Sequence, residues 1–416
     1  MNDVKFVKRF PSGTIHIPAS KSILQRAVIC AGAAEGTSTI RNISMSDDVR
    51  AAAECMQKLS ADIEISDGCM RITGSSGKSA AGQLECGESA AVLRFLMPMA
   101  SVLRDETVFS GSPELMSRPL EMYLDLLSSH GACGTLDKNM LVMRGRLLPG
   151  KYQLRGDISS QYVSGLLMAL PLLDSPSIIE AVPRLESAGY AALTLDVMEK
   201  FGVKAESRGS VFYVPGGSRY KPADIEAEGD YSSAAFFLAA GALGCSCDIA
   251  GLNLHSVQGD RRILKILSDS GAEVSVTSGK IRVSTGRLRA QKIDVSDIPD
   301  LVPPLAAFFS FCEGRSVMYN ASRLRYKESD RLSSVTAALS ALGADVKAAG
   351  DSIEITGASS LRGGIMNSFN DHRIAMMGAV AAVRSTGSVG IIGSGSVKKS
   401  YPDFWRDFEK TEKAEI

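Results

Sequence analysis

The sequence predicts an α/β protein of two domains, each built from three copies of a repeated unit in which helices pack behind mixed sheets. Two observations lead to this prediction. The chain has 416 residues, enough for two or three domains of roughly 150 residues each. One structural phrase also recurs along the chain: a helix ends at a small residue, and two β-rich stretches joined by a polar turn follow it.

The copies of this phrase are evenly spaced. Glycine after a helix adopts the left-handed conformation that ends it, and the SDG, SRGS and TSGK stretches are typical of hairpin turns. Residues 58–74, 128–145, 199–216, 268–286 and 340–357 are therefore each predicted to end a helix and form a hairpin. The helix-ending positions, in steps of 71, 71, 69 and 72 residues, are Ser60, Gly131, Gly202, Gly271 and Gly343.

Five copies are visible, although the length leaves room for six. A sixth helix is expected in PDFWRDFEKTEKA, near the C-terminus, and the chain begins with VKFVKRFPSGTIHIP, which has the pattern strand, turn, strand. We therefore expect this N-terminal hairpin to complete the sixth unit. The predicted C-terminal domain is 1–20 with 229–416, the predicted N-terminal domain is 21–228, and the active site is expected in the cleft between them.

Composition excludes several classes of protein. Lys plus Arg equals Asp plus Glu at 46 each, which argues against a nucleic-acid or anionic-membrane partner. The eight cysteines form no CxxC pair and the four histidines lack ligand spacing, so we predict neither a disulfide scaffold nor a metal site. The segment MNDVKFVKRFPSG lacks the apolar core of a secretory signal, and no apolar run reaches membrane-spanning length. A cytoplasmic protein is expected.

Polar residues gather at the starts of predicted helices. Lys21 and Ser22 open the helix in SILQRAVICAGAA, with Arg26 one turn further on, and Asp157–Gln161 precedes YVSGLLMALPLL. Free backbone N–H groups at a helix start favour phosphate or carboxylate groups. An ordinary helix cap is the simpler interpretation of either cluster taken alone.

Two charged clusters are more informative. Lys327–Arg331 (KESDR) precedes LSSVTAALSALGA, and Asn370–Arg373 (NDHR) precedes IAMMGAVAAV. Their charges are confined to the first turn, and arginine there opposes the helix dipole, so each cluster needs an anionic partner. Further candidates, each of which alone would be a surface charge or a helix cap, are Arg94, Arg118, Asp300 and Lys399.

Eight motifs occur along the chain in this order: KSILQRA, GESAAVLR, SRPL, SSQ, IPD, YKESDRL, NDHRIAM and KKSYPDF. Together they resemble the 5-enolpyruvylshikimate-3-phosphate synthase family, the 3-phosphoshikimate 1-carboxyvinyltransferases. The resemblance covers nearly the whole chain. It implies a two-domain inside-out α/β barrel of the enolpyruvyl transferase type, with six βαββαβ units, three per domain, that closes around its substrates. It also implies transfer of the enolpyruvyl (carboxyvinyl) group of phosphoenolpyruvate to the 5-hydroxyl of shikimate 3-phosphate, with release of phosphate, in chorismate and aromatic amino acid biosynthesis.

The resemblance also implies the site residues. Asp300 and Glu328 match acid/base carboxylates with Lys21 beside them as a third catalytic group, and which of these carries which proton stays open. Residues that match shikimate 3-phosphate positions are Lys21, Ser22, Arg26, Ser159, Ser160, Gln161, Ser187, Asp300 and Lys327. Residues that match phosphoenolpyruvate positions are Lys21, Arg94, Arg118, Gln161, Arg331, Arg373 and Lys399. No metal or organic cofactor is implied, and a monomer is expected.

The loop from Gly87 to Arg94 departs from the GNAGTAMR pattern that is usual in the family. Glu88 replaces Asn, Ala90 replaces Gly and Ala91 replaces Thr. The methyl group of Ala90 predicts weak inhibition by glyphosate, which resembles phosphoenolpyruvate in charge but is longer. Arg323 also stands where an Asn is frequent, and we assign it no role.

Two alternatives stay open. The sister enzyme that acts on UDP-N-acetylglucosamine has the same architecture, but it usually carries a reactive Cys in a mobile loop where this chain has GSPELMSRPLEM. A non-catalytic binder of anions or nucleic acid is the second alternative, and zero net charge argues against it.

Overall fold

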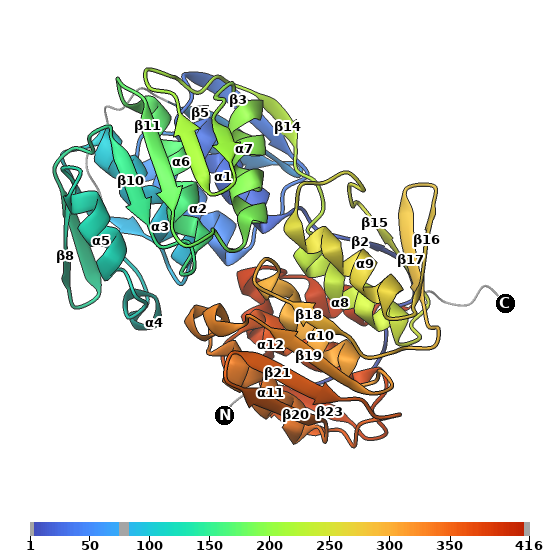
Figure 1. The fold of residues 1–416 in the computed structure, drawn as a ribbon. Coiled ribbons are helices and arrows are strands. Elements are labelled where there is room, and N and C mark those ends of the chain that lie inside the picture. Colours follow the sequence, from blue (N-terminus) through green and yellow to red (C-terminus); the bar gives the residue numbers. More distant parts are fainter. Residues whose placement is uncertain (1–3, 75–82, 412–416) are drawn as a thin grey trace. The chain divides into compact units, whose positions relative to one another are not determined.

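The computed structural model describes residues 4–74 and 83–411 (Figure 1). The chain divides into two compact units: unit 1 is Met1–Pro18 with Glu228–Ile416, and unit 2 is Ala19–Ala227. These bounds differ by one or two residues from the domain limits expected from the sequence. Each unit has a hydrophobic core of its own.

Apolar helices form the centre of unit 1. Every residue of α8 (Tyr231–Ala242), α10 (Val302–Phe309) and α12 (His372–Ala382) is buried, so these helices lack the polar stripe of a surface helix. They pack against one another. The remaining α-helices in the described part of unit 1 are α9 (Ile263–Asp269), α11 (Arg331–Ala341) and α13 (Phe404–Phe408).

Unit 2 has the same plan. Its most buried helices are α1 (Lys21–Gly32), α3 (Ala90–Leu103) and α6 (Ser160–Ala169), and α3 packs against α6. The other α-helices described in this unit are α2 (Asp47–Lys58), α4 (Pro113–Met116), α5 (Glu121–Ser128) and α7 (Ala188–Lys200).

Within the described residues the strands form six mixed sheets, three in each unit, and every sheet contains one parallel pair. The sheets of unit 2 are, in strand order, β14 (Asp224–Glu226), β3 (Gly36–Arg41), β5 (Cys69–Gly74) and β4 (Asp62–Ser66); β6 (Leu84–Glu85), β7 (Glu106–Ser110), β9 (Met140–Arg144) and β8 (Cys133–Asp137); and β10 (Lys151–Leu154), β11 (Ser177–Ala181), β13 (Val211–Val214) and β12 (Glu206–Arg208). The sheets of unit 1 are β16 (Glu273–Thr277), β17 (Lys280–Ser284), β15 (Cys247–Ala250) and β2 (Gly13–His16); β18 (Lys292–Asp294), β19 (Arg315–Tyr319), β21 (Ser352–Thr356) and β20 (Asp345–Ala349); and β1 (Val4–Phe6), β23 (Val389–Ile392) and β22 (Gly364–Asn367).

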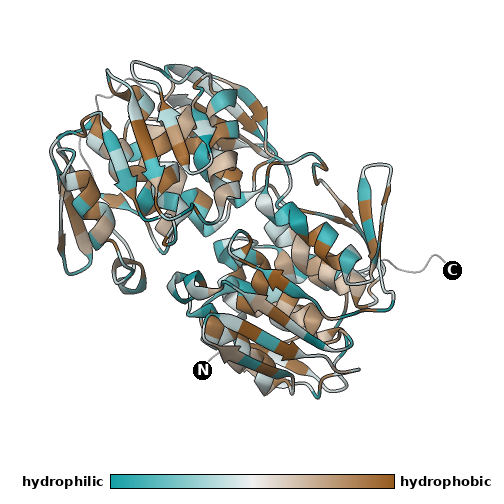
Figure 2. Cartoon of the chain, in the orientation of Figure 1, coloured by the Kyte–Doolittle hydropathy of each residue, from teal (hydrophilic) through white to brown (hydrophobic). Residues whose placement is uncertain are grey.

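The strands present one face to the helices and the other to solvent. In β5, for example, Met70 and Ile72 are buried whereas Arg71 and Thr73 are exposed. Hydrophobic and hydrophilic segments alternate along the strands in Figure 2. Helices therefore lie inside and sheets outside in each unit, as the predicted fold class requires.

The repeated helix–hairpin phrase is confirmed. All five copies form antiparallel hairpins: β4–β5, β8–β9, β12–β13, β16–β17 and β20–β21. The residue that ends the helix has a positive φ in every copy, from 80° at Gly202 to 95° at Ser60. Four of the five are glycine because the left-handed conformation is costly for a residue with a Cβ.

The N-terminal segment does not form the hairpin expected from the sequence. β1 pairs antiparallel with β23, whereas β2 pairs parallel with β15 in a different sheet. Residues 7–12 join the two strands, and this connection is longer than the two to five residues typical of a hairpin, so it can lead from one sheet to the next. In unit 2, β14 pairs parallel with β3 at the edge of its sheet. It takes the same place there that β2 takes beside β15 in unit 1.

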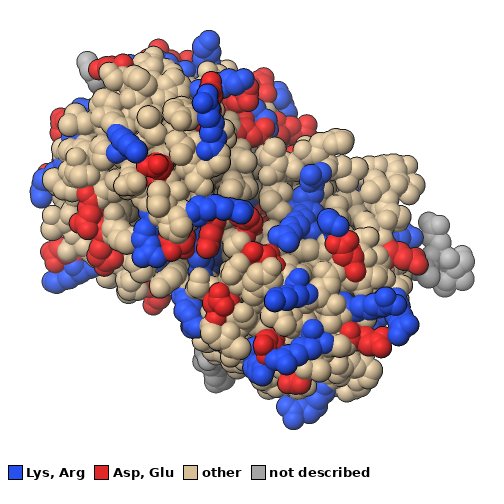
Figure 3. Space-filling view, in the orientation of Figure 1, with Lys and Arg blue, Asp and Glu red and all other residues tan. Residues whose placement is uncertain are grey.

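Charged residues are mixed over the protein surface. On the face shown in Figure 3, Lys and Arg side chains are interspersed with Asp and Glu side chains. No helix within the described ranges is long and apolar enough to cross a membrane.

Candidate active site

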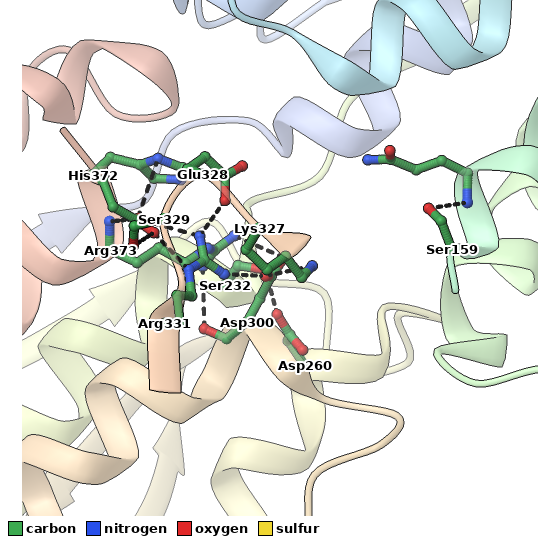
Figure 4. Close-up of polar contacts among 12 residues, drawn as sticks. Ser159, Ser232, Asp260, Asp300, Lys327, Glu328, Ser329, Arg331, His372 and Arg373 are labelled. Atoms are coloured by element: carbon green, nitrogen blue, oxygen red, sulfur yellow. Dashed lines mark hydrogen bonds and ion pairs between the residues drawn. The ribbon is translucent and has the colours of Figure 1, made fainter. Parts of the chain in front are cut away.

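Charged side chains from several helix starts meet in unit 1 (Figure 4). Asp300 lies in the 3-10 turn η3 (Pro299–Leu301), which leads directly into α10. Glu328 precedes α11, which begins at Arg331. We call the group that these elements assemble the ion cluster; its members are Asp300, Lys327, Glu328, Arg331, Asp371 and Arg373.

Arg331 lies at the centre of the ion cluster, with 1% of its side chain exposed. Its Nε donates to Asp371 Oδ2 at 2.8 Å, its Nη1 to Asp300 Oδ1 at 2.8 Å and its Nη2 to Glu328 Oε2 at 2.6 Å. Burial acts to lower the pKa of Arg331, but the carboxylates of Asp371, Glu328 and Asp300 outweigh it and raise that pKa well above its ordinary value. Arg331 therefore remains charged and fixes the positions of these carboxylates.

Asp300 accepts hydrogen bonds from further cations. Lys327 Nζ lies 3.1 Å from Asp300 Oδ1, and Arg373 Nη2 lies 3.1 Å from Asp300 Oδ2. Burial lowers the pKa of Lys327, partly offset by the charge of Asp300. An anion that took over these donors would release the carboxylate oxygens of Asp300 for proton transfer.

The local backbone explains how α12 delivers Arg373. Asp371 caps this helix by accepting the Arg373 backbone N–H at 2.9 Å. The two preceding residues, Phe369 and Asn370, have φ values of 53° and 55°, a left-handed conformation that is costly for phenylalanine. Lys399 Nζ donates to the Asn370 carbonyl oxygen at 2.7 Å, which places this predicted cation beside the turn.

In unit 2, the start of α1 carries Lys21. Its Nζ lies 2.8 Å from Asp48 Oδ2, and both side chains are 14% exposed. Asp48 belongs to the first turn of α2, whose cap is Ser46. The lysine is thus held at a helix start by a carboxylate from the neighbouring helix.

Arg26, on the same helix, is 2% exposed. Its Nε donates to Thr194 Oγ1 at 2.7 Å, its Nη1 to the Ser22 carbonyl oxygen at 2.8 Å and its Nη2 to Ser164 Oγ at 3.0 Å. The guanidinium carbon also lies 4.7 Å from the centre of the Phe95 ring. Burial lowers the pKa of Arg26 to about 10. The donors expected to hold a substrate are engaged with protein groups in this structure.

Arg94 and Gln161 are brought together from α3 and α6. Arg94 Nη1 donates to Gln161 Oε1 at 2.7 Å, and its guanidinium carbon lies 5.1 Å from the centre of the Tyr162 ring. Ser159 caps α6 by accepting the Gln161 backbone N–H at 3.3 Å. Ser160, the first residue of that helix, is buried.

The other predicted positions of unit 2 lie at helix ends. Ser187 is buried and precedes α7 in a left-handed conformation, with φ 54°. Arg118 is half-buried in the turn after α4. Glu88 is exposed, whereas Ala90, the first residue of α3, is 7% exposed. The departures from the family loop therefore include one surface residue and one packed residue.

The structure thus assigns the predicted residues to one unit or the other. Unit 1 assembles Asp300, Lys327, Glu328, Arg331 and Arg373 through direct contacts, with Lys399 nearby in the fold. Unit 2 contains Lys21, Ser22, Arg26, Arg94, Arg118, Ser159, Ser160, Gln161 and Ser187. Sequence reasoning assigned no role to Asp371, although it stands in the NDHR cluster, and it did not single out Asp48.

The comparison with known families decides between the alternatives. The family model of EPSP synthase (3-phosphoshikimate 1-carboxyvinyltransferase) matches residues 9–408. The chain belongs to the EPSP synthase family. Since this match spans nearly the whole chain, the resemblance noted in the sequence is confirmed, as is the fold class.

Relatives and solved structures agree with membership of the EPSP synthase family. The 3-phosphoshikimate 1-carboxyvinyltransferase of Clostridium kluyveri is 42% identical over 97% of this chain and 97% of its own, and that of Clostridioides difficile is 38% identical over 98% and 97%. The EPSP synthase structure from Acinetobacter baumannii matches with a TM-score of 0.80 at 26% identity, covering 97% of each chain. The enolpyruvyl transferase NikO from Streptomyces tendae, at 17% identity and a TM-score of 0.77 over 97% of this chain and 96% of its own, shares the fold.

The described part of this EPSP synthase family member contains no group of three or more His, Cys, Asp or Glu side chains arranged to hold a metal ion. The carboxylates of the ion cluster are instead paired with Lys327, Arg331 and Arg373.

Proposed function

We propose that the ion cluster of unit 1, together with Lys21, Arg94 and Gln161 of unit 2, carries out the reaction of this family. The chain is a 3-phosphoshikimate 1-carboxyvinyltransferase of the shikimate pathway. It transfers the carboxyvinyl group of phosphoenolpyruvate to the 5-hydroxyl of shikimate 3-phosphate and releases phosphate. The observation that supports the residue assignment best is Asp300, a carboxylate surrounded by the donors of Lys327, Arg331 and Arg373.

The substrates supply anions that match these donors. Two phosphates and two carboxylates need several cations, and guanidinium groups bind both kinds of anion through paired hydrogen bonds. For phosphoenolpyruvate we propose Lys21, Arg94, Arg118, Gln161, Arg331, Arg373 and Lys399. For shikimate 3-phosphate we propose Lys21, Ser22, Arg26, Ser159, Ser160, Gln161, Ser187, Asp300 and Lys327.

Proton transfer is proposed to depend on Asp300, Glu328 and Lys21. The 5-hydroxyl oxygen must form a bond to C2 of phosphoenolpyruvate as it loses its proton, and the methylene carbon must gain a proton and become a methyl group. The carbon–oxygen bond to phosphate then breaks, phosphate leaves, and the methyl group loses a proton, which restores the double bond. Before substrates bind, Arg331 and Lys327 donate to Asp300 Oδ1 and Arg373 donates to Oδ2, so this carboxylate becomes a competent base when the anions draw those donors away. The same cations stabilise charge on the departing phosphate.

Residues of both units are required for this assignment, so we propose that the two units act on one pair of substrates and close around them. Binding of shikimate 3-phosphate should then reduce the radius of gyration measured by small-angle scattering. An unchanged radius at saturating ligand would contradict closure.

The decisive functional experiment measures phosphate release from the purified chain. Release should require both phosphoenolpyruvate and shikimate 3-phosphate, and UDP-N-acetylglucosamine should not replace the second substrate. The residue assignment is tested separately with Asp300→Asn, which keeps the side-chain volume and removes the charge. We further propose that the enzyme acts as a cytoplasmic monomer and that glyphosate inhibits it weakly.

A further inference from the structure

A buried carboxyl group lies beside the ion cluster but is not part of it. Asp260 belongs to the 3-10 turn η2 (Gly259–Arg262) of unit 1, and 4% of the residue is exposed. One of its oxygens, Oδ2, is hydrogen-bonded to the Ser232 hydroxyl, at the start of α8 (Figure 4). The other, Oδ1, is buried and has no hydrogen-bond partner among the described residues. No Lys or Arg in the part of the chain that the structure describes forms an ion pair with Asp260.

The charges around Asp260 come from several elements. Asp300 faces it from η3, Arg373 from α12, and Asp230, the cap of α8, from the helix start that carries Ser232. Arg373 uses its guanidinium to hydrogen-bond Asp300. The arginines of its own turn, Arg261 and Arg262, donate instead to the carbonyl oxygens of Leu254 and Asp294.

Asp260 is consequently balanced between its two protonation states. Burial first, and then the negative charge of Asp300, raise the pKa of Asp260 to about 7, while Arg373 and the bond to Ser232 act to lower it and Asp230 raises it further. The Ser232 hydroxyl can donate to the ionised carboxylate or accept from the carboxylic acid. Protonation therefore needs no rearrangement of this contact.

An anion bound to Arg373 would favour the protonated form of Asp260. It would neutralise the positive charge that favours ionised Asp260 and would add negative charge in a poorly solvated environment. We propose that Asp260 is a positioning residue for anion binding, which takes up a proton when an anionic substrate engages Arg373 and the neighbouring cations. The uptake removes a repelling charge, so that Arg373 remains available to the anion. This inference rests on the proposed binding role of the ion cluster.

The test counts the protons taken up on binding. Phosphoenolpyruvate, and in a separate series shikimate 3-phosphate, is titrated into the full chain at pH 7.5 by calorimetry in buffers of different ionisation enthalpy. Neither ligand reacts without the other, and the proton change of the ligand itself is the same for every variant. The difference between wild type and Asp260→Asn therefore reports Asp260.

We expect Asp260→Asn, which keeps the size of the side chain and a bond to Ser232, to take up fewer protons than wild type. A group with a pKa of about 7 is roughly three-quarters ionised at pH 7.5, so the deficit should be roughly half a proton or more. Asp248→Asn is the matched control: Asp248, on β15, pairs with Arg282, on β17, and its pKa is lowered chiefly by that hydrogen bond. The proton count of this variant should equal that of wild type.

Each outcome has a distinct meaning. Equal proton counts in wild type and Asp260→Asn would overturn the inference, because a merely structural role changes affinity or folding but not proton uptake. If Asp260→Asn does not fold, the wild-type chain alone decides: its affinity must fall between pH 7 and 8.5 more steeply than the ligand's own titration explains, and a parallel course refutes the inference. Failure of wild type to bind either ligand would instead refute the proposed function.

Discussion

Replacing Arg331 with methionine should destabilise unit 1 by about 3 kcal/mol. Removing one partner of a buried ion pair costs about 3–5 kcal/mol because the other charge is left without compensation. Arg331 is 1% exposed and Asp371 is fully buried, and two of the arginine's nitrogens contact that carboxylate, at 2.8 and 3.3 Å. Methionine fills a similar volume, so the loss should come from the charge and not from a cavity.

We expect a loss at the lower end of the range of about 3–5 kcal/mol because the carboxylates keep other hydrogen-bond donors. Asp371 retains the Arg373 backbone N–H at 2.9 Å and the Ser329 hydroxyl at 3.2 Å. Asp300 retains Lys327 and Arg373. The unfolding free energy should therefore fall chiefly because of Asp371.

The chain provides its own probe for this measurement. Trp405 is the only tryptophan in the sequence, lies in α13 of unit 1 and donates from Nε1 to the Ser394 carbonyl oxygen at 3.0 Å. Its fluorescence in urea should follow the unfolding of unit 1, and linear extrapolation gives the free energy.

A double variant tests whether the uncompensated charge of Asp371 causes the loss of stability. Adding Asp371→Asn to Arg331→Met removes the uncompensated charge while an asparagine can still cap α12, so about 1 kcal/mol or more should be recovered. The reasoning is refuted if Arg331→Met alone unfolds within about 0.5 kcal/mol of wild type, a change typical of an ordinary surface substitution.

Three further predictions concern activity. Asp300→Asn and Glu328→Gln should each lower turnover at saturating substrates by about 100-fold or more, measured as phosphate release, and near-normal rates in both would contradict the acid/base assignment. Because burial lowers the pKa of Lys327, its charge should be present below that lowered pKa and lost as the pH rises through it, and the affinity for shikimate 3-phosphate should fall with it. Lys327→Arg should keep its affinity over the same rise in pH, and a parallel decline in both proteins would refute this. Ala90→Gly should strengthen glyphosate inhibition by about one to two decades, since a packed site penalises an extra methyl by about 1–3 kcal/mol, whereas equal inhibition constants would exclude this methyl as the cause.

Local features of the sequence predicted the repeats because the signal lies within each copy. A residue that must adopt a left-handed conformation, followed by alternating apolar positions and a polar turn, specifies a helix end and a hairpin without reference to the rest of the chain. Gly202 and Gly271 are examples, and both have the expected positive φ. The pairing of β1 and β2 could not be predicted in this way, because it depends on which distant sheet edges are open.

In the candidate site, too, the features with a local sequence signal were predictable and those that depend on distant parts of the chain were not. The helix-start charges of Arg331 and Arg373 were visible in sequence, since arginine in a first turn needs an anion. That the anion near Arg331 is Asp371, forty residues further along, is decided by the packing of α11 beside α12. Asp260 gave no signal at all: a single acid in QGDRR is typical of a surface turn, and only the fold shows that it is buried.

The pairing of β1 with β23 also determines the order in which the chain can fold during synthesis. Val4 lies opposite Ile392, so β1 can pair only after β23 has been synthesised. At about 5–20 residues per second, the 387 residues between them take roughly 20–80 s to make. Unit 2 is continuous from Ala19 to Ala227 and has its complete sequence long before then. Translation should therefore leave a folded middle with an unpaired strand at its N-terminal side until β23 has been made.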